Sequence, residues 1–187
     1  MSTKIYIDQG HNPVNPNAGA EGNGLREQDL VYVIGQRLAE RLRADGNFEV
    51  RLSRPSRESQ LGTSTSTSLA ARVNEANRWG ADYFISLHTN AASSPSANGS
   101  EALVYDKSGR SFGFAEDILT NMVNVTGLRD RGVKARPGLY VLRKTRMPAV
   151  LLELGFITNP GDAALMRDSP GLFAEGIYRG IREFVGA

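Results

Sequence analysis

The chain has 187 residues, of which 40% are apolar, so we expect a single domain with a sizeable core rather than a disordered chain. A formal net charge of +2, with no basic run interleaved with aromatic residues, argues against nucleic-acid binding, and a pI near 9.0 mildly favours polyanionic surroundings such as a cell wall or a membrane surface. The absence of cysteine excludes disulfides and thiolate ligands, so any zinc would be bound by histidine and carboxylate.

The first half of the chain alternates short β-branched runs with amphipathic helical patterns. A stripe of apolar residues with intervals of three and four predicts the first helix, and glycine and proline mark the loops. Ser68 is predicted to cap the second helix. In order, we predict a strand at residues 4–8, a long loop at 9–24, a helix at 26–45, a strand at 48–53, a polar loop at 54–68 and a helix at 69–79.

The second half continues the alternation and predicts a sheet whose centre is apolar on both faces. Residues 83–87 form that central strand. There follow a loop at 89–99, an edge strand at 100–105, a helix at 111–125, a basic loop at 127–138, strands at 139–142 and 149–154, and helices at 160–167 and 171–185. This order predicts an α/β fold, with residues 1–187 forming one three-layer domain around a mostly parallel twisted sheet of about six strands.

Four side chains are expected at one rim of that sheet. The only two histidines, His11 and His88, each follow a predicted strand, and Glu27 lies at the start of the first helix. Glu153 interrupts an apolar run, where a carboxylate is costly unless it is paired or bound to a cation. Because ligands of open α/β sheets bind beyond the carboxyl ends of the strands, these residues should meet there.

Each of these residues alone also has an ordinary structural explanation. Either histidine could be satisfied by backbone groups, Glu27 could be a favourable charge at a helix N-terminus, and Glu153 could pair with an arginine. Together they match a catalytic zinc site, which uses three protein ligands, an open position for water and a separate carboxylate base. The residues alone leave open whether Glu27 is the ligand and Glu153 the base, or the reverse.

Four ordered segments resemble the zinc-dependent N-acetylmuramoyl-L-alanine amidase catalytic domains of sporulation and division amidases and phage endolysins. They are residues 8–11 (DQGH), 19–27 (GAEGNGLRE), 86–91 (SLHTNA) and 148–159 (PAVLLELGFITN). The resemblance implies that His11, Glu27 and His88 bind Zn²⁺ and that Glu153 is the general base. It implies hydrolysis of the amide between the lactyl group of N-acetylmuramic acid and L-alanine of the peptidoglycan stem peptide. The loop after His11 and Asp29 depart from the usual pattern, but neither removes a ligand.

The same resemblance suggests how the chain meets its substrate. Arg131 is expected to pair with a stem-peptide carboxylate and Asn90 to hydrogen-bond substrate, although both could be solvated loop residues. Peptidoglycan is the expected partner, together with an activating protein or a separate wall-binding domain, and the expected location is extracytoplasmic. No signal peptide or membrane span is evident in the sequence. Two alternatives are a catalytically weak peptidoglycan-binding module that needs a partner to load metal, and a zinc hydrolase of another amide, such as a deacetylase.

Overall fold

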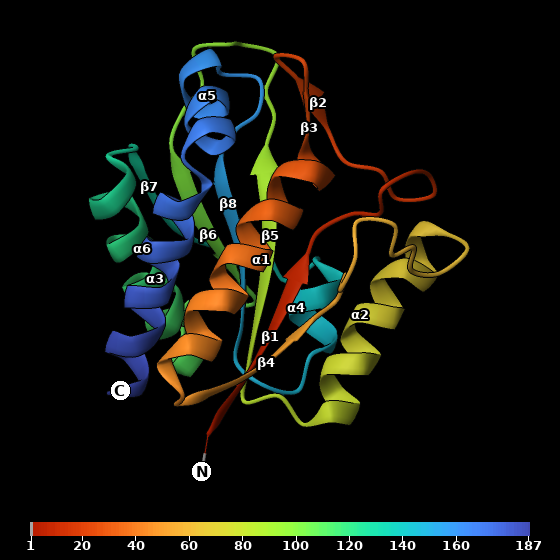
Figure 1. Cartoon of the computed structure of the whole chain (residues 1–187), viewed down its shortest axis with the longest axis vertical. Helices are drawn as coiled ribbons and strands as arrows, with labels where there is room; N and C mark the ends of the chain where they lie inside the picture. Colours follow the sequence, from red (N-terminus) through yellow and green to blue (C-terminus); the bar gives the residue numbers. More distant parts are fainter. Residues whose placement is uncertain (1) are drawn as a thin grey trace.

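A central sheet of six strands runs through the computed structural model, which describes residues 2–187 (Figure 1). Its strands lie in the order β4-β1-β5-β8-β6-β7. The first four are parallel to one another, β6 is antiparallel to β8, and β7 is parallel to β6, so the prediction of a mostly parallel sheet is confirmed. Their bounds are β1 Thr3–Gln9, β4 Phe48–Leu52, β5 Tyr83–Asn90, β6 Ser100–Val104, β7 Asp130–Ala135 and β8 Ala149–Phe156.

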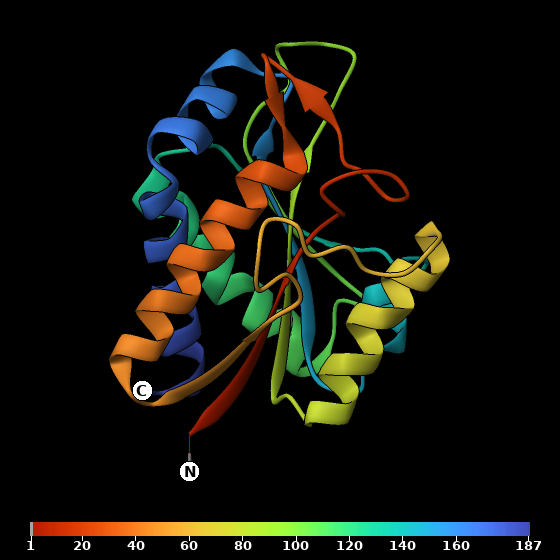
Figure 2. The ribbon, with the colours of Figure 1, turned by 45° about the vertical axis from the view of Figure 1, so that its right-hand side comes forward.

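Helices cover both faces of the sheet, which gives the predicted three layers (Figure 2). One face packs against α1 (Glu27–Asp45), α3 (Gly109–Thr126) and α6 (Pro170–Val185), and the other against α2 (Thr65–Trp79) and α4 (Tyr140–Lys144). The short helix α5 (Pro160–Asp168) follows β8. Within residues 2–187, no helix is long and apolar enough to cross a membrane.

Alternation along β1 explains how a single strand serves both layers. Ile5 and Ile7 are fully buried in the larger core cluster, on the side of α1 and α6. Tyr6 points to the opposite face, where its ring stacks on Phe84 with centroids 5.5 Å apart and its hydroxyl donates to Glu75 of α2. Successive residues of a strand point to opposite faces, so an unbroken apolar run is what a strand buried on both sides requires.

The edge of the sheet differs from the prediction. Residues 100–105 were expected to form the edge strand and 127–138 a loop, but β6 lies between β8 and β7, and β7 is the edge. The basic residues concealed β7, because Arg131 and Lys134 both pair with a carboxylate of β6, Glu101. Charged side chains are typical of an exposed edge strand, because they hinder pairing with strands of other molecules.

Two predicted elements on the α2 and α4 face are also wrong. Residues 139–142 were expected to be a strand, but Val141 and Leu142 are buried on one side of helix α4. Ser68 does not cap α2, because the helix begins one turn earlier. Its cap is Ser64, whose hydroxyl accepts from the backbone N–H of Thr67 while the Thr67 hydroxyl accepts from that of Ser64.

The long loop after β1 contains a small hairpin, β2 (Glu21–Gly22) and β3 (Leu25–Arg26), that the prediction missed. Asn23 and Gly24 form its turn, and both have positive φ. Asn-Gly is the favoured pair for a two-residue hairpin turn, so the signal was present in the sequence. The Asn23 side chain donates to the carbonyl of Ile157 at 2.8 Å, which fixes the hairpin beside the end of β8.

Candidate active site

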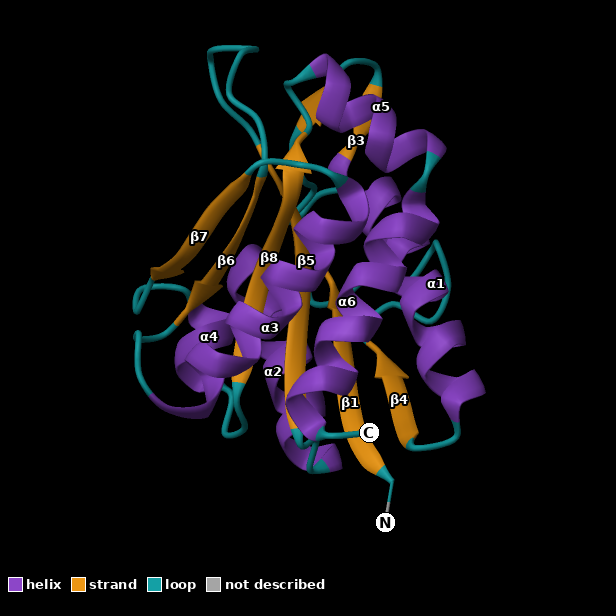
Figure 3. Ribbon diagram, turned by 90° about the vertical axis from the view of Figure 1, so that its left-hand side faces the viewer, coloured by secondary structure: helices purple, strands orange, loops and turns teal. Residues whose placement is uncertain are grey.

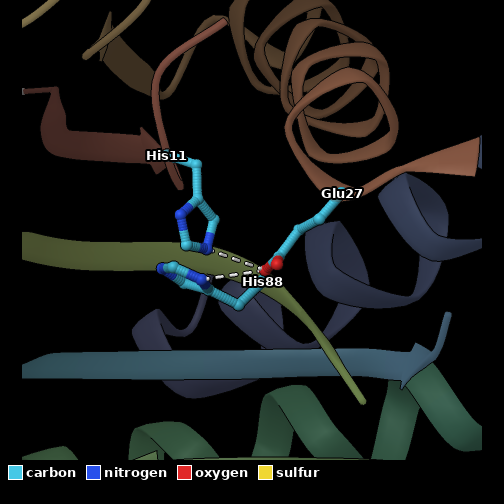
Figure 4. Close-up of side chains that lie close together, drawn as sticks. All are labelled: His11, Glu27 and His88. Carbon is cyan, nitrogen blue, oxygen red and sulfur yellow. Dashed lines mark hydrogen bonds and ion pairs between the residues drawn. The ribbon is translucent and has the colours of Figure 1, made fainter. Parts of the chain in front are cut away.

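Three of the predicted residues meet at the carboxyl ends of β1 and β5 (Figure 4). His11 is the second residue after the end of β1, and Glu27 is the first residue of α1. His88 lies within β5 rather than after it. The Glu27 Oε1 atom is 3.2 Å from His11 Nε2 and 3.1 Å from His88 Nδ1. The potential ligand atoms of all three lie within 4.8 Å of one another.

The Glu27 carboxylate is fixed from several sides. Its Oε1 accepts from the backbone N–H of Thr89 and its Oε2 from that of Ala20, each at 2.9 Å. Burial opposes ionisation, but hydrogen bonds from His11 and His88 outweigh it and hold the pKa of Glu27 well below its usual range. The group is therefore a carboxylate at neutral pH, held in one place before any cation binds.

A fully buried ion pair, Arg72 with Asp8, contacts the backbone of His11. Arg72 of α2 lies 2.5 Å from Asp8 of β1, and its second amino group donates to the carbonyl of His11 at 2.6 Å. His11 has a φ of 63°, an uncommon conformation for a residue with a side chain. The hydrogen bond from Arg72 holds the His11 carbonyl in this conformation, so the ion pair supports the backbone that carries the His11 side chain.

Replacing Arg72 by methionine should lower the free energy of unfolding by about 3–5 kcal/mol, because it leaves the buried Asp8 carboxylate without its partner. Denaturant unfolding measures this, with Arg78→Met, an exposed position on the same helix, as the control. Adding Asp8→Asn to Arg72→Met should recover part of the loss. No recovery in the double variant would show that the two charges do not act as a pair.

The three residues fit a zinc ion. A tetrahedral zinc with bonds of about 2.1 Å separates its ligand atoms by about 3.4 Å, close to the two distances from Glu27 to the histidines. Two imidazoles and one carboxylate form a common ligand set for catalytic zinc. The side chains of Glu27 and His11 also fill the space beside Gly19. A methyl group on Gly19 would lie 2.8 Å from Glu27 Oε2 and 2.9 Å from His11 Cδ2.

Gly19→Ala should therefore weaken zinc binding without removing a ligand. The atoms nearest to the added methyl group would be side-chain atoms of Glu27 and His11, so the fold should tolerate it while the ligands shift. We expect a loss of about 10- to 100-fold in zinc affinity, the range for changes beside metal ligands. Competition with a chromogenic chelator measures it. Gly138→Ala, where the methyl group meets nothing, is the control and should bind zinc like the unaltered chain.

Glu153 lies beside this cluster on the neighbouring strand. It is paired in register with His88 of β5 on one side and with Glu101 of β6 on the other. Its Oε2 atom is buried without a hydrogen-bond partner, and within residues 2–187 Glu153 forms no ion pair with an arginine. Burial, aided by the negative charges of Glu27 and Glu101 and opposed by His88, raises the pKa of Glu153 to about 7.

This raised pKa predicts a pH dependence for the metal-free chain. Because the folded-state pKa of Glu153 exceeds its ordinary value of 4.5, protonation favours folding. The stabilisation should be complete below about pH 4.5 and lost as the pH rises through about 7, by roughly 3 kcal/mol. Urea unfolding between pH 5 and 8 measures this loss, and Glu153→Gln should remove it. If the free energy of unfolding changes with pH equally in the unaltered chain and in Glu153→Gln, the prediction is wrong.

Glu101 is a site residue that the sequence analysis missed. It is buried and pairs with Lys134 and with Arg131, whose Nε lies 3.1 Å from its Oε2. Asn90 donates to its other oxygen at 3.2 Å. The two expected substrate-binding residues, Arg131 and Asn90, are thus joined through one carboxylate beside Glu153. The sequence did contain a signal for this residue, because Glu101 is an acid within a short apolar run and cations follow at positions 131 and 134.

Comparisons with known proteins agree with this geometry. The family model described as N-acetylmuramoyl-L-alanine amidase matches residues 5–183. The chain is similar to the N-acetylmuramoyl-L-alanine amidase LytC of Bacillus subtilis, with 40% identity over 88% of this chain and 32% of that protein. It is also similar to the endolysin of Bacillus phage SPP1, with 34% identity over 99% of this chain and 67% of that protein.

Among solved structures, the catalytic domain of the amidase CwlV from Bacillus (Paenibacillus) polymyxa has the same fold. It superposes with a TM-score of 0.87 at 30% identity, over 98% of each chain. The chain spans about a third of the length of LytC and about two thirds of that of the phage endolysin. The match over nearly the whole sequence, in both family model and fold, confirms the predicted resemblance. The chain belongs to the N-acetylmuramoyl-L-alanine amidase family.

Proposed function

We propose that residues 1–187 form a zinc-dependent amidase domain that cleaves the bond between the lactyl group of N-acetylmuramic acid and L-alanine in peptidoglycan. The main support for this proposal is that the cluster of His11, Glu27 and His88 lies beside a second glutamate, Glu153, whose surroundings differ from those of Glu27. Glu27 is fully hydrogen-bonded and ionised, whereas Glu153 has an unpartnered oxygen and a pKa near 7. A metal ligand must be ionised and held in place, as Glu27 is. A general base needs a pKa near the working pH and a free oxygen, as Glu153 has.

His11, Glu27 and His88 would hold the ion, and Glu153 would move the proton. A bound zinc supplies Lewis-acid polarisation of the scissile carbonyl and lowers the pKa of the attacking water. Glu153 accepts the proton of that water as the C–O bond forms. It then donates the proton to the nitrogen of L-alanine as the C–N bond breaks, which leaves a carboxylic acid on the lactyl group and a free amino terminus. The different environments of the two side chains support Glu27 as the ligand and Glu153 as the base.

Arg131 and Asn90 are proposed to contact the stem peptide. Arg131 uses its Nε for Glu101 and one amino group for the carbonyl of Asn98, and about a quarter of its side chain remains exposed. Its guanidinium also lies 4.9 Å from the ring of Phe156, which fixes its plane. A fixed guanidinium with a free edge is suited to a carboxylate of the stem peptide.

The test is hydrolysis of purified sacculi by the zinc-loaded chain. Release of new L-alanine amino termini without new reducing sugar ends supports the amidase, and added chelator should abolish it. Release of acetate instead would indicate a deacetylase. Binding without release of either product, at one zinc per chain, would favour the peptidoglycan-binding module that depends on a partner.

Place and partners follow from the same proposal. A chain that cleaves peptidoglycan acts outside the cytoplasm, at the cell wall. We propose that an activating protein or a separate wall-binding domain directs the chain to its substrate.

A further inference from the structure

A basic groove lies at the opposite end of the sheet from the metal cluster. Residues 131–152 contain six cations and no acid, so the rest of the chain carries a net charge of −4. Two of these cations, Arg131 and Lys134, neutralise Glu101 near the metal cluster. The other four are exposed and form no ion pair within residues 2–187. They are Arg136, Arg143, Lys144 and Arg146.

Two of these cations, Arg143 and Arg146, line one groove together with Arg110 of α3. A groove of about 410 Å³ is lined by Tyr105, Ser108, Arg110, Ser111, Arg143 and Arg146. Its lining residues come from the segment after β6, the segment before β8 and the end of α4, and Figure 3 shows the end of β6, the start of β8 and α4 near one another. Glu153 is four residues along β8 from Ala149, so about 13 Å of strand separates the start of β8, at the groove, from Glu153 beside the metal cluster.

The basic wall of the groove is rigid. The Asn77 side chain on α2 donates to the carbonyl of Lys144 and accepts from the N–H of Arg146, each at 3.0 Å. The Thr145 hydroxyl donates to the carbonyl of Val141 at 2.8 Å. These bonds use backbone groups of the segment and leave the charged ends of Arg143 and Arg146 free. A fixed backbone lowers the entropy cost of binding a ligand.

The one acid that lines the groove is already engaged. Asp106 accepts from both the backbone N–H and the hydroxyl of Ser108, at 2.9 and 2.5 Å. Guanidinium groups beside hydroxyls match the oxygens of a phosphate, and Tyr105, 44% exposed, adds an apolar surface for the groups between phosphates. Several separated cations along an open groove favour a ligand that carries repeated charges over a single small anion.

We propose that this groove binds a phosphodiester polymer of the cell wall and holds the chain with its metal cluster directed away from that polymer. The inference rests on the proposed function, since peptidoglycan places the chain in the wall. Because the groove lies at the start of β8 and the cluster lies beside Glu153, four residues further along that strand, the chain has room to bind the polymer while peptidoglycan occupies the cluster.

The test is co-sedimentation with two preparations of the same sacculi, one that retains its phosphate polymer and one from which it has been removed. Chelator is present so that the sacculi are not degraded, and poly(glycerol phosphate) serves as a soluble probe by fluorescence anisotropy. The groove variant is Arg143→Gln/Arg146→Gln. The control is Arg37→Gln/Arg43→Gln, which makes the same change in net charge on exposed positions of α1.

We expect the unaltered chain to bind the phosphate-bearing sacculi at least about fivefold more tightly, and the groove variant to lose that preference while the control keeps it. Equal binding to both preparations, or an equal loss in the control, would overturn the inference. Hydrolysis of the stripped sacculi, measured separately with zinc, should be unchanged in the groove variant. An inactive chain that still prefers phosphate-bearing sacculi would overturn only the amidase proposal.

Discussion

Glu153→Gln should reduce hydrolysis of sacculi by about 10²- to 10⁴-fold while the chain still binds one zinc. Glutamine fills the same space but cannot accept the proton of the attacking water. The substitution should not harm the fold, because the buried Oε2 atom has no partner to lose and the raised pKa shows that the site disfavours a charge. The measurements are release of L-alanine amino termini and zinc content by atomic absorption.

The control for this variant is Glu116→Gln, at an exposed position of α3, which should retain full activity. Loss of zinc from Glu153→Gln would mean that the roles of the two glutamates are exchanged. Retained activity would mean that another group accepts the proton, and Glu101, the neighbouring carboxylate on β6, would be the next to replace.

His88→Ala should abolish both zinc binding and activity, since it removes one of the three ligand atoms and half of the hydrogen bonds that Glu27 Oε1 receives from histidine. Zinc bound to the folded chain stabilises it by mass action. At a free concentration about 1,000 times the Kd, the unaltered chain should gain about 4 kcal/mol in the free energy of unfolding, and His88→Ala should gain almost nothing. Thermal unfolding with and without zinc measures both.

Glu153→Gln is the matched control for this experiment, because it lies beside His88 but should retain the full zinc-dependent stabilisation. If His88→Ala is stabilised by zinc as much as the unaltered chain, the cluster of His11, Glu27 and His88 is not the metal site. If zinc stabilises neither His88→Ala nor the unaltered chain, zinc is not the cation that this cluster binds.

The sequence by itself determined the order of most elements and which residues meet in the candidate site. Apolar runs such as β1 and β5 and the amphipathic stripe of α1 are local patterns with a fixed period, so they can be read without tertiary information. The rim of the sheet was also predictable, because parallel strands with right-handed crossovers bring the residues that follow them to one edge. His11 and His88 thereby came together from positions 77 residues apart.

Only the tertiary structure decided what depends on pairing between distant segments. β7 was concealed because its charged residues are compensated by Glu101, a partner on another strand, and α4 because its apolar residues are buried against a neighbouring layer. The different characters of Glu27 and Glu153 were hidden for the same reason. Both are glutamates in the sequence, and it is the surrounding donors of one and the burial of the other that set their pKa values apart.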